Sequence, residues 1–236
     1  MIKALFFDLD DTVYDYRGPM RDCEEYLSDT VAQSVGVESD KCLRTYLRLK
    51  RELYKESPHD PVIFDFRFRI SRLFSKLGDM VNERRIDAIF TDFWQRFLMM
   101  IEPYPDLIPL LDVAGEEGLK TAIVTNGTVE QQTSKIDRLA LSDTMDLALT
   151  SEEVGANKPQ PSIFLRALDR LGVCAEEAIM IGDICQVDIK GANEVGMPTC
   201  WIRRGIHSGS PPRDRSETPD FSVRALRDIP GLLEAF

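Results

Sequence analysis

The stretch Ile2-Lys3-Ala4-Leu5-Phe6-Phe7-Asp8-Leu9-Asp10-Asp11-Thr12 decides the fold of this chain. Residues 2–7 form an almost unbroken apolar run, which is typical of a strand that is buried on both faces within a parallel sheet. The run stops abruptly at Asp8, and in open parallel sheets ligands bind at the carboxyl ends of the strands. The sequence therefore predicts a buried first strand that delivers acidic side chains to a functional site.

Short apolar runs of the same kind recur downstream and alternate with helical patterns. The clearest helical pattern ends at Gly172, which is placed as a C-terminal cap, and it comprises Ile163, Phe164, Ala167, Leu168 and Leu171. Alternating strands and amphipathic helices predict an α/β fold, a Rossmann-like parallel sheet with helices on both faces. The predicted strands after the first are residues 121–124, 147–149, 178–181 and 199–202.

Residues 16–101 have a different pattern, because they contain no strand-like run and their apolar residues follow helical spacing. We expect this segment to be an inserted α-helical bundle, or cap domain, and residues 1–15 and 102–236 to form the catalytic core. The prolines of Pro103-Tyr104-Pro105 would stiffen the chain where the sheet resumes. A cap is expected to close over the site, exclude water and contact the substrate beyond its reacting group.

The composition argues against several classes of function. A formal net charge of −11 on 236 residues disfavours DNA or RNA as a partner. No apolar run approaches the roughly 18–20 residues that span a bilayer, and the first residues do not form a signal peptide, so no membrane partner is expected. Five scattered cysteines without a C-x-x-C pair indicate reduced thiols and a cytoplasmic protein. The only histidines, His59 and His207, argue against a His-rich metal site or a Ser-His-Asp triad.

Asp8 and Asp10 offer a pair of carboxylates, because side chains two apart on an extended segment point the same way. Neighbouring carboxylates separate in pKa or bind a cation between them. One carboxylate can attack phosphorus and form an acyl phosphate, while a second acid protonates the leaving oxygen and then deprotonates water. We interpret Asp8 as the nucleophile and Asp10 as the general acid/base, although an acidic turn after a strand has the same D-x-D pattern.

Two later segments offer groups that can bind a phosphoryl group. Thr125, Asn126 and Gly127 follow a predicted strand, and a hydroxyl, a side-chain amide and backbone N–H groups can surround a phosphate. The alternative is a plain loop in which Thr128 caps the next helix. Lys158 can balance the charge of a carboxylate nucleophile and a transferring phosphoryl group, whereas most lysines are solvated at the surface.

Asp183 and Asp188 follow the predicted strand at residues 178–181 and suit a magnesium site. Mg²⁺ prefers oxygen ligands, keeps several waters, and usually takes one or two carboxylates together with substrate phosphate. Asp8, Asp183 and a phosphate oxygen would fit, with Asp188 holding a bound water or orienting Lys158. The alternative is an ordinary Gly-Asp turn.

These segments together resemble the motifs of the haloacid dehalogenase superfamily, in its phosphatase branch with a helical cap after the first motif. Asp8-Leu9-Asp10-Asp11-Thr12 matches the first motif, and the others are matched by Thr125, by Lys158, and by Gly182-Asp183 with Asp188. The resemblance spans nearly the whole chain and departs only slightly at Ile184, where the family often has Ser or Asn. The resemblance implies that Asp8 is the nucleophile and also binds Mg²⁺, and that Asp10 is the general acid/base, with its backbone carbonyl on the metal. It further implies that Thr125 and Lys158 bind the phosphoryl group, and that Asp183 and Asp188 are two further residues at the metal.

The expected function is magnesium-dependent hydrolysis of small phosphomonoesters through an aspartyl-phosphate on Asp8. The substrate, a small phosphorylated metabolite, stays open among sugar phosphates, small organic phosphates and nucleoside monophosphates, and no oligomeric state is indicated. A phosphomutase shares all four motifs and stays open as well. Hydrolysis of a carbon–halogen bond also uses an aspartate nucleophile, but it needs neither a metal nor Asp10. A binding module without activity would be expected to lack a catalytic residue, and none is missing.

Overall fold

The computed structural model describes residues 1–58, 60–205 and 210–233, so His59 and His207 lie outside the described residues. The chain divides into two compact units. The first consists of Met1–Asp15 and Glu102–Phe236, and the second is Tyr16–Ile101. All five cysteines are described and carry free thiols. In the described ranges, no helix combines the length and the apolar character that a membrane span requires.

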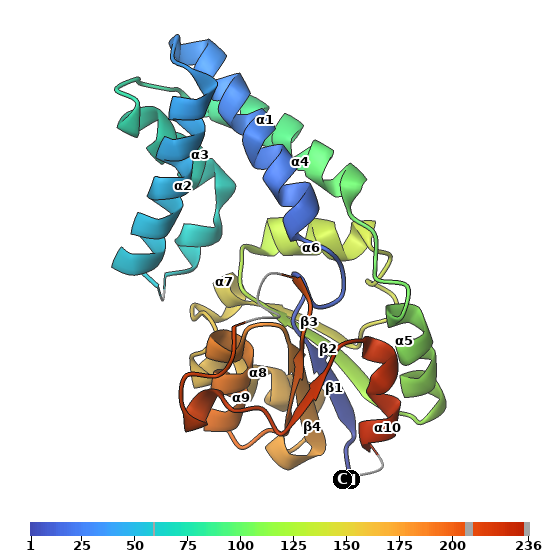
Figure 1. The fold of residues 1–236 in the computed structure, drawn as a ribbon. Coiled ribbons are helices and arrows are strands. Elements are labelled where there is room, and N and C mark those ends of the chain that lie inside the picture. The colour runs from blue at the N-terminus through green and yellow to red at the C-terminus, as the bar shows by residue number, and fades with distance from the viewer. Residues whose placement is uncertain (59, 206–209, 234–236) are drawn as a thin grey trace. The chain divides into compact units, whose positions relative to one another are not determined.

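The first unit is built on a six-stranded sheet in which every strand pair is parallel, in the order β3-β2-β1-β4-β5-β6 (Figure 1). This confirms the predicted α/β fold with a parallel sheet. The strand β1 lies in the interior, paired with β2 on one side and β4 on the other. The strands are β1 (Ala4–Phe7), β2 (Lys120–Thr125), β3 (Leu147–Thr150), β4 (Ala178–Gly182), β5 (Thr199–Ile202) and β6 (Phe221–Val223).

The last strand, β6, has no counterpart among the predicted strands. It contains only three residues, of which Val223 alone is buried, so its sequence carries no clear apolar run or alternation. It pairs with β5 through Cys200, Trp201 and Ile202. Its place at the edge of the sheet is set by this pairing, which sequence periodicity does not report.

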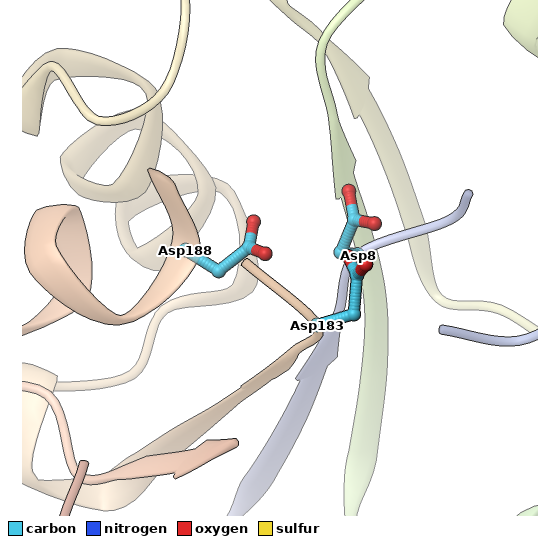
Figure 2. A group of neighbouring side chains, drawn as sticks. All are labelled: Asp8, Asp183 and Asp188. Atoms are coloured by element: carbon cyan, nitrogen blue, oxygen red, sulfur yellow. The ribbon is translucent and has the colours of Figure 1, made fainter. Parts of the chain in front are cut away.

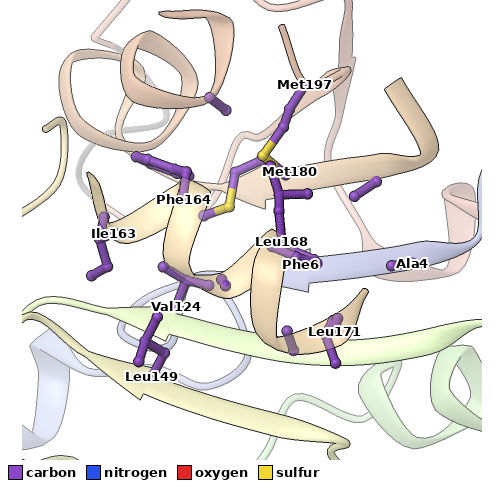
Figure 3. Packing of buried hydrophobic residues seen from close by; sticks show 14 residues of the cluster. Ala4, Phe6, Val124, Leu149, Ile163, Phe164, Leu168, Leu171, Met180 and Met197 are labelled. Atoms are coloured by element: carbon purple, nitrogen blue, oxygen red, sulfur yellow. The ribbon is translucent and has the colours of Figure 1, made fainter. Parts of the chain in front are cut away.

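Helices cover the sheet, and one of its faces packs on α8 (Pro161–Leu171) and α9 (Lys190–Glu194). Figure 3 shows this apolar cluster, in which Phe6 of β1 and Met180 of β4 lie with Phe164 and Leu168 of α8. Each large apolar side chain buried here stabilises the fold by about 1.5–3 kcal/mol relative to its exposed state. Gly172 ends α8 in the left-handed conformation, with φ 64°, as its predicted role as a C-cap requires. The other helices of this unit are α5 (Leu107–Glu116), α6 (Val129–Arg138), α7 (Ser151–Val154) and α10 (Pro230–Leu233).

The second unit is all helical, which confirms the predicted helical insertion after the first strand. Its helices are α1 (Arg17–Val35), α2 (Ser39–Glu56), α3 (Phe66–Lys76) and α4 (Glu83–Met100), and they pack as α1 on α2, α1 on α4, α2 on α3 and α3 on α4. An aromatic core holds α3 against α4, where Phe66 lies 4.9 Å from Phe93 and 5.6 Å from Trp94 between ring centroids. Such pairs add to the stabilisation that burial provides.

The insertion leaves and rejoins the sheet unit at neighbouring points of its backbone. Tyr14 and Pro103 form an isolated antiparallel bridge, and the N–H of Tyr104 donates to the carbonyl of Val13 at 2.9 Å. The chain therefore returns to the sheet unit beside the residue from which it departed. This pairing holds the turn after β1 in place, and that turn carries Asp10.

Candidate active site

Asp8 and Asp183 meet because they follow neighbouring strands. Phe7 of β1 pairs with Ile181 of β4, and the N–H of Asp8 donates to the carbonyl of Ile181 at 2.9 Å. Both side chains therefore emerge at the carboxyl edge of the sheet, side by side, as Figure 2 shows. Both are buried. This is the edge at which the sequence predicted a site.

Asp188 joins this pair from the turn after β4, a single π-helical turn at Cys185–Ile189. One of its oxygens, Oδ2, accepts a hydrogen bond from the N–H of Ile184 at 3.0 Å. The turn packs tightly on Gly182, because a Cβ at that position would lie 2.4 Å from the Cβ of Asp188. One carboxylate oxygen from each of Asp8, Asp183 and Asp188 lies within 4.8 Å of those of the other two (Figure 2).

Lys158 provides the positive charge of the site. Its Nζ lies 2.6 Å from Oδ1 of Asp8 and 2.7 Å from Oδ1 of Asp188. The side chain is buried, which rules out the solvated surface position that is usual for lysine. Burial alone would lower the pKa of Lys158, but the carboxylates of Asp188 and Asp8 outweigh that effect and hold the pKa above its ordinary value. Lys158 therefore stays charged.

Three buried carboxyl groups, those of Asp8, Asp183 and Asp188, lie in this site with one lysine. Burial, followed by the neighbouring charges of Asp8 and Asp188, raises the pKa of Asp183 to about 10. Burial also raises the pKa of Asp8 to about 7, with Lys158 opposing the shift and Asp188 and Asp10 adding to it. Neither carboxylate oxygen of Asp183 has a hydrogen-bond partner within the described chain. Buried polar atoms are normally paired, so these two oxygens and the neighbouring carboxylates fit a divalent cation with oxygen ligands.

The loop after β2 supports Lys158 through its backbone. The side chain of Asn126 accepts from the N–H of Lys158 at 2.8 Å and donates to its carbonyl at 3.2 Å. Thr125 is buried, and its Oγ1 accepts from Nε2 of Gln132 at 3.0 Å. Thr128 caps α6, as the alternative interpretation of this loop predicted. The loop thus both starts a helix and holds Lys158, and binding of substrate by Thr125 and Asn126 stays a prediction.

Gly127 is needed in this loop for two reasons. Its φ is 145°, in a region that glycine favours, and a Cβ there would lie 2.5 Å from Nε2 of Gln132. Its N–H donates to Oγ of Ser151 at 2.9 Å. That N–H is therefore used within the protein in this structure, and binding of substrate by Gly127 stays a prediction.

Asp10 lies close to Asp8, but its carboxylate is not part of the group formed by Asp8, Asp183 and Asp188. The Nζ of Lys135 lies 2.7 Å from Oδ1 and 2.8 Å from Oδ2 of Asp10, and the hydroxyl of Tyr14 donates to Oδ1 at 2.5 Å. Strand β1 ends at Phe7, and Asp11 has a positive φ of 59°. Asp10 therefore lies beyond the end of the strand, and its shared orientation with Asp8 stays a prediction. Metal binding by its backbone carbonyl stays a prediction.

Three side chains that the sequence analysis missed complete the site. Tyr14 and Lys135 hold Asp10, and Gln132 holds Thr125. Lys135 and Gln132 are buried although they belong to α6, a short and mostly polar helix. A signal was present, because Gln132 and Lys135 are three apart and share a face with the buried Ile136. Polar residues on the apolar face of a helix can indicate a site, but they are also common at helix ends.

A family model matches most of the chain, and curated relatives match nearly all of it. The family model described as haloacid dehalogenase-like hydrolase matches residues 2–196. The chain is 34% identical to the glyceraldehyde 3-phosphate phosphatase of Methanopyrus kandleri, over 97% of this chain and 96% of the relative. It is 33% identical to the ribulose-1,5-bisphosphate 5-phosphatase of Halopiger xanaduensis, over 99% of this chain and 100% of the relative.

Two solved structures have a similar fold over almost the whole length of both chains. A HAD phosphatase from Thermococcus onnurineus has a TM-score of 0.77 and 27% identity, and the match covers 98% of each chain. A 2-haloacid dehalogenase from Pseudomonas syringae pv. Tomato DC3000 has a TM-score of 0.75 and 26% identity, and the match covers 100% of this chain and 99% of that one. One of these similar structures is named a phosphatase and the other a dehalogenase, so the fold alone does not determine the reaction.

Proposed function

The chain belongs to the haloacid dehalogenase-like hydrolase family, and we propose that it is a magnesium-dependent phosphatase that hydrolyses small sugar phosphates. The observation that carries the proposal is the meeting of a buried carboxylate pair, Asp8 and Asp183, with the buried cation Lys158 at one edge of the sheet. A dianionic phosphoryl group is stabilised by positive charge and by a metal beside the nucleophile. Asp8 is the candidate nucleophile because it directly follows β1 and its carboxylate contacts Lys158.

The proposed reaction has two steps on phosphorus. In the first, a carboxylate oxygen of Asp8 attacks phosphorus, the bond to the ester oxygen breaks, and Asp10 gives its proton to the leaving oxygen. In the second, the Asp10 carboxylate takes a proton from water, and the water oxygen attacks phosphorus. The bond between phosphorus and Asp8 then breaks and inorganic phosphate is released.

The remaining polar residues stabilise charge in both steps. Lys158 would hold the phosphoryl oxygens beside Asp8, and Asp188 would keep Lys158 in place through the contact at 2.7 Å. Asp8, Asp183 and Asp188 would hold Mg²⁺, the last directly or through a water. Bound Mg²⁺ offsets the negative charge of these carboxylates and of the phosphoryl oxygens. Thr125 and the backbone of its loop would complete the phosphate site.

The choice of substrate and of reaction is supported by different observations. The two relatives named above act, by their names, on glyceraldehyde 3-phosphate and on the 5-phosphate of ribulose 1,5-bisphosphate, which supports a small phosphorylated sugar. The structural similarity to a 2-haloacid dehalogenase supports attack by Asp8 on carbon as a second candidate. The carboxylate of Asp10 favours phosphoryl transfer, and so do the oxygens of Asp183, which lack partners among the described residues, because displacement of a halide uses neither an acid nor a metal.

A panel assay tests the proposal. Purified protein is incubated with glyceraldehyde 3-phosphate, ribulose 1,5-bisphosphate, other phosphomonoesters and 2-chloropropionate, each with Mg²⁺ or with a chelator. We expect phosphate release from sugar phosphates that requires Mg²⁺, and no chloride release. Chloride release without phosphate release would support the dehalogenase instead. Conversion of a sugar phosphate into an isomer without net phosphate release would support a phosphomutase.

A further inference from the structure

We propose that Lys135 is a positioning residue that fixes the carboxylate of Asp10 for its work as an acid and base. The inference rests on the proposed phosphatase function, because it assigns a purpose to a contact of the candidate acid/base. It concerns a side chain on α6 that belongs to none of the four motifs that match the family. The contact lies wholly within the sheet unit.

The geometry of the contact is that of a fixed support. The Nζ of Lys135 lies 2.7 Å and 2.8 Å from the two oxygens of Asp10, so it contacts both ends of the carboxylate. The hydroxyl of Tyr14 donates to Oδ1 from a second direction at 2.5 Å. Two donors on different elements restrict rotation of the carboxylate. General acid–base catalysis depends on such restriction, because the carboxyl group must lie within hydrogen-bond reach of the proton that it transfers.

Lys135 is itself held firmly. Its side chain is 4% exposed, whereas that of Asp10 is 28% exposed, so the cation is the buried partner and the carboxylate is the accessible one. An ammonium group is costly to bury unless it is paired, and burial lowers the pKa of Lys135 while Asp10 opposes that shift. A lysine at the surface would be screened by water and free to change its rotamer, whereas a buried lysine keeps one position. The burial of Lys135 suits a support that leaves the far side of Asp10 open.

The same helix also supports the loop that follows β2. One turn before Lys135, Gln132 donates from Nε2 to Oγ1 of Thr125 at 3.0 Å and to the carbonyl of Asn126 at 2.5 Å. Residues three apart lie on one face of a helix. Helix α6 therefore ties Asp10 to the candidate phosphate-binding loop and fixes the distance between them, which is the distance that proton transfer to a bound ester depends on.

Kinetics of three variants test the inference. Lys135→Met removes the donor and keeps the bulk of the side chain, Lys135→Arg restores a cation, and Arg138→Met removes a cation from the exposed side of the same helix. For Lys135→Met we expect kcat to fall by about 10-fold or more, within the range that acid–base catalysis contributes. We expect unchanged KM and unchanged inhibition by inorganic phosphate, because Lys135 contacts Asp10. Lys135→Arg should recover part of kcat, and Arg138→Met should behave as the wild type.

Two results would overturn the inference. One is wild-type kcat in folded Lys135→Met. The other is a loss of affinity for inorganic phosphate that matches the loss of kcat, since this would make Lys135 a phosphate ligand. If Lys135→Met does not fold, Lys135→Gln removes the charge and the contact with both oxygens of Asp10 but keeps a polar side chain, and it should lower kcat without changing KM. Unchanged kcat in that variant would then overturn the inference.

Crystal structures separate failure of this inference from failure of the proposed function. If the wild type releases no phosphate from any phosphomonoester, the proposed function fails, but the position of Asp10 can still be observed. In the wild type we expect one conformer of Asp10 with Lys135 at both oxygens. In Lys135→Met, or in Lys135→Gln if the former does not fold, we expect Asp10 to turn or to adopt several conformers. An unmoved Asp10 in that variant would overturn the positioning role.

Discussion

The Nζ of Lys158 lies 2.6 Å from Oδ1 of Asp8, although 150 residues separate them in the sequence. The contact joins the loop before α8 to the end of β1, and Asn126 fixes it by binding the backbone of Lys158 on both sides. Lys158 also contacts Asp188, so one ammonium group serves two buried carboxylates. The charge balance of the site therefore depends on this lysine.

Replacement of Lys158 by methionine should lower both the stability and the activity of the protein. Asp8 and Asp188 would be left buried without their cation, which costs about 3–5 kcal/mol when one partner of a buried pair is removed. We expect a lower free energy of unfolding in urea at pH 8 and a fall in kcat/KM of at least about 100-fold. Lys41→Met, at an exposed position of α2, is the control. Wild-type activity in Lys158→Met would contradict the proposed role of this lysine.

The stability of the cation-free protein should fall as the pH rises. The pKa of Asp183 is about 10 and that of Asp8 about 7 in the folded protein, against an ordinary value of 3.8. The folded state therefore binds more protons than the unfolded state above about pH 4, and each group can lower the free energy of unfolding by up to about 1.4 kcal/mol per pH unit. Urea denaturation with a chelator between pH 6 and pH 8.5 measures this slope.

Two changes should flatten that pH dependence. Mg²⁺ takes the place of the protons and binds only the folded site, so it should stabilise the protein most at high pH. Asp183→Asn removes the group with the larger shift, and it should also weaken the response to Mg²⁺. Asp112→Asn, at an exposed position of α5, should keep the wild-type slope. Stability that rises with pH in the presence of the chelator would contradict this description of the site.

A methyl group at Gly182 should disturb Asp188. The added Cβ would lie 2.4 Å from both Cβ and Cγ of Asp188, and the first of these is fixed to the backbone. We expect Gly182→Ala to destabilise the protein by about 1–3 kcal/mol and to lower activity, because Asp188 would lose its position beside Lys158. Gly115→Ala in α5 is the matched control, since nothing lies within 4 Å of its added Cβ, and it should stabilise the helix slightly. Equal behaviour of the two variants would contradict the argument.

The sequence predicted the parts of the fold that local patterns determine. Buried parallel strands are apolar without interruption, so residues 2–7 and 178–181 identified β1 and β4, and the residues after them identified Asp8 and Asp183. The helical insertion followed from its spacing. Strand β6 was missed because only Val223 among its three residues is buried, and its pairing with β5 is a tertiary contact.

The parts of the site that were missed depend on contacts across the fold. Lys135 lies 125 residues from Asp10, and the helix face that it shares with Gln132 and Ile136 does not indicate which carboxylate it contacts. The contacts that Asp10 makes with Lys135 and Tyr14 were also not predicted, because Asp10 lies beyond the end of β1. Spacing gives the direction of a side chain only while the backbone stays regular.

In the proposed mechanism Asp8 becomes covalently phosphorylated, so we would first trap that intermediate. The protein is mixed with Mg²⁺ and the best substrate of the panel, quenched in acid within milliseconds, and digested for mass spectrometry. We predict a phosphate on Asp8 that hydroxylamine removes, formed and lost fast enough to account for kcat, and absent from Asp8→Asn, which should also lack turnover. Turnover by Asp8→Asn at the wild-type rate, or rapid wild-type turnover without phosphate on Asp8, would contradict the mechanism.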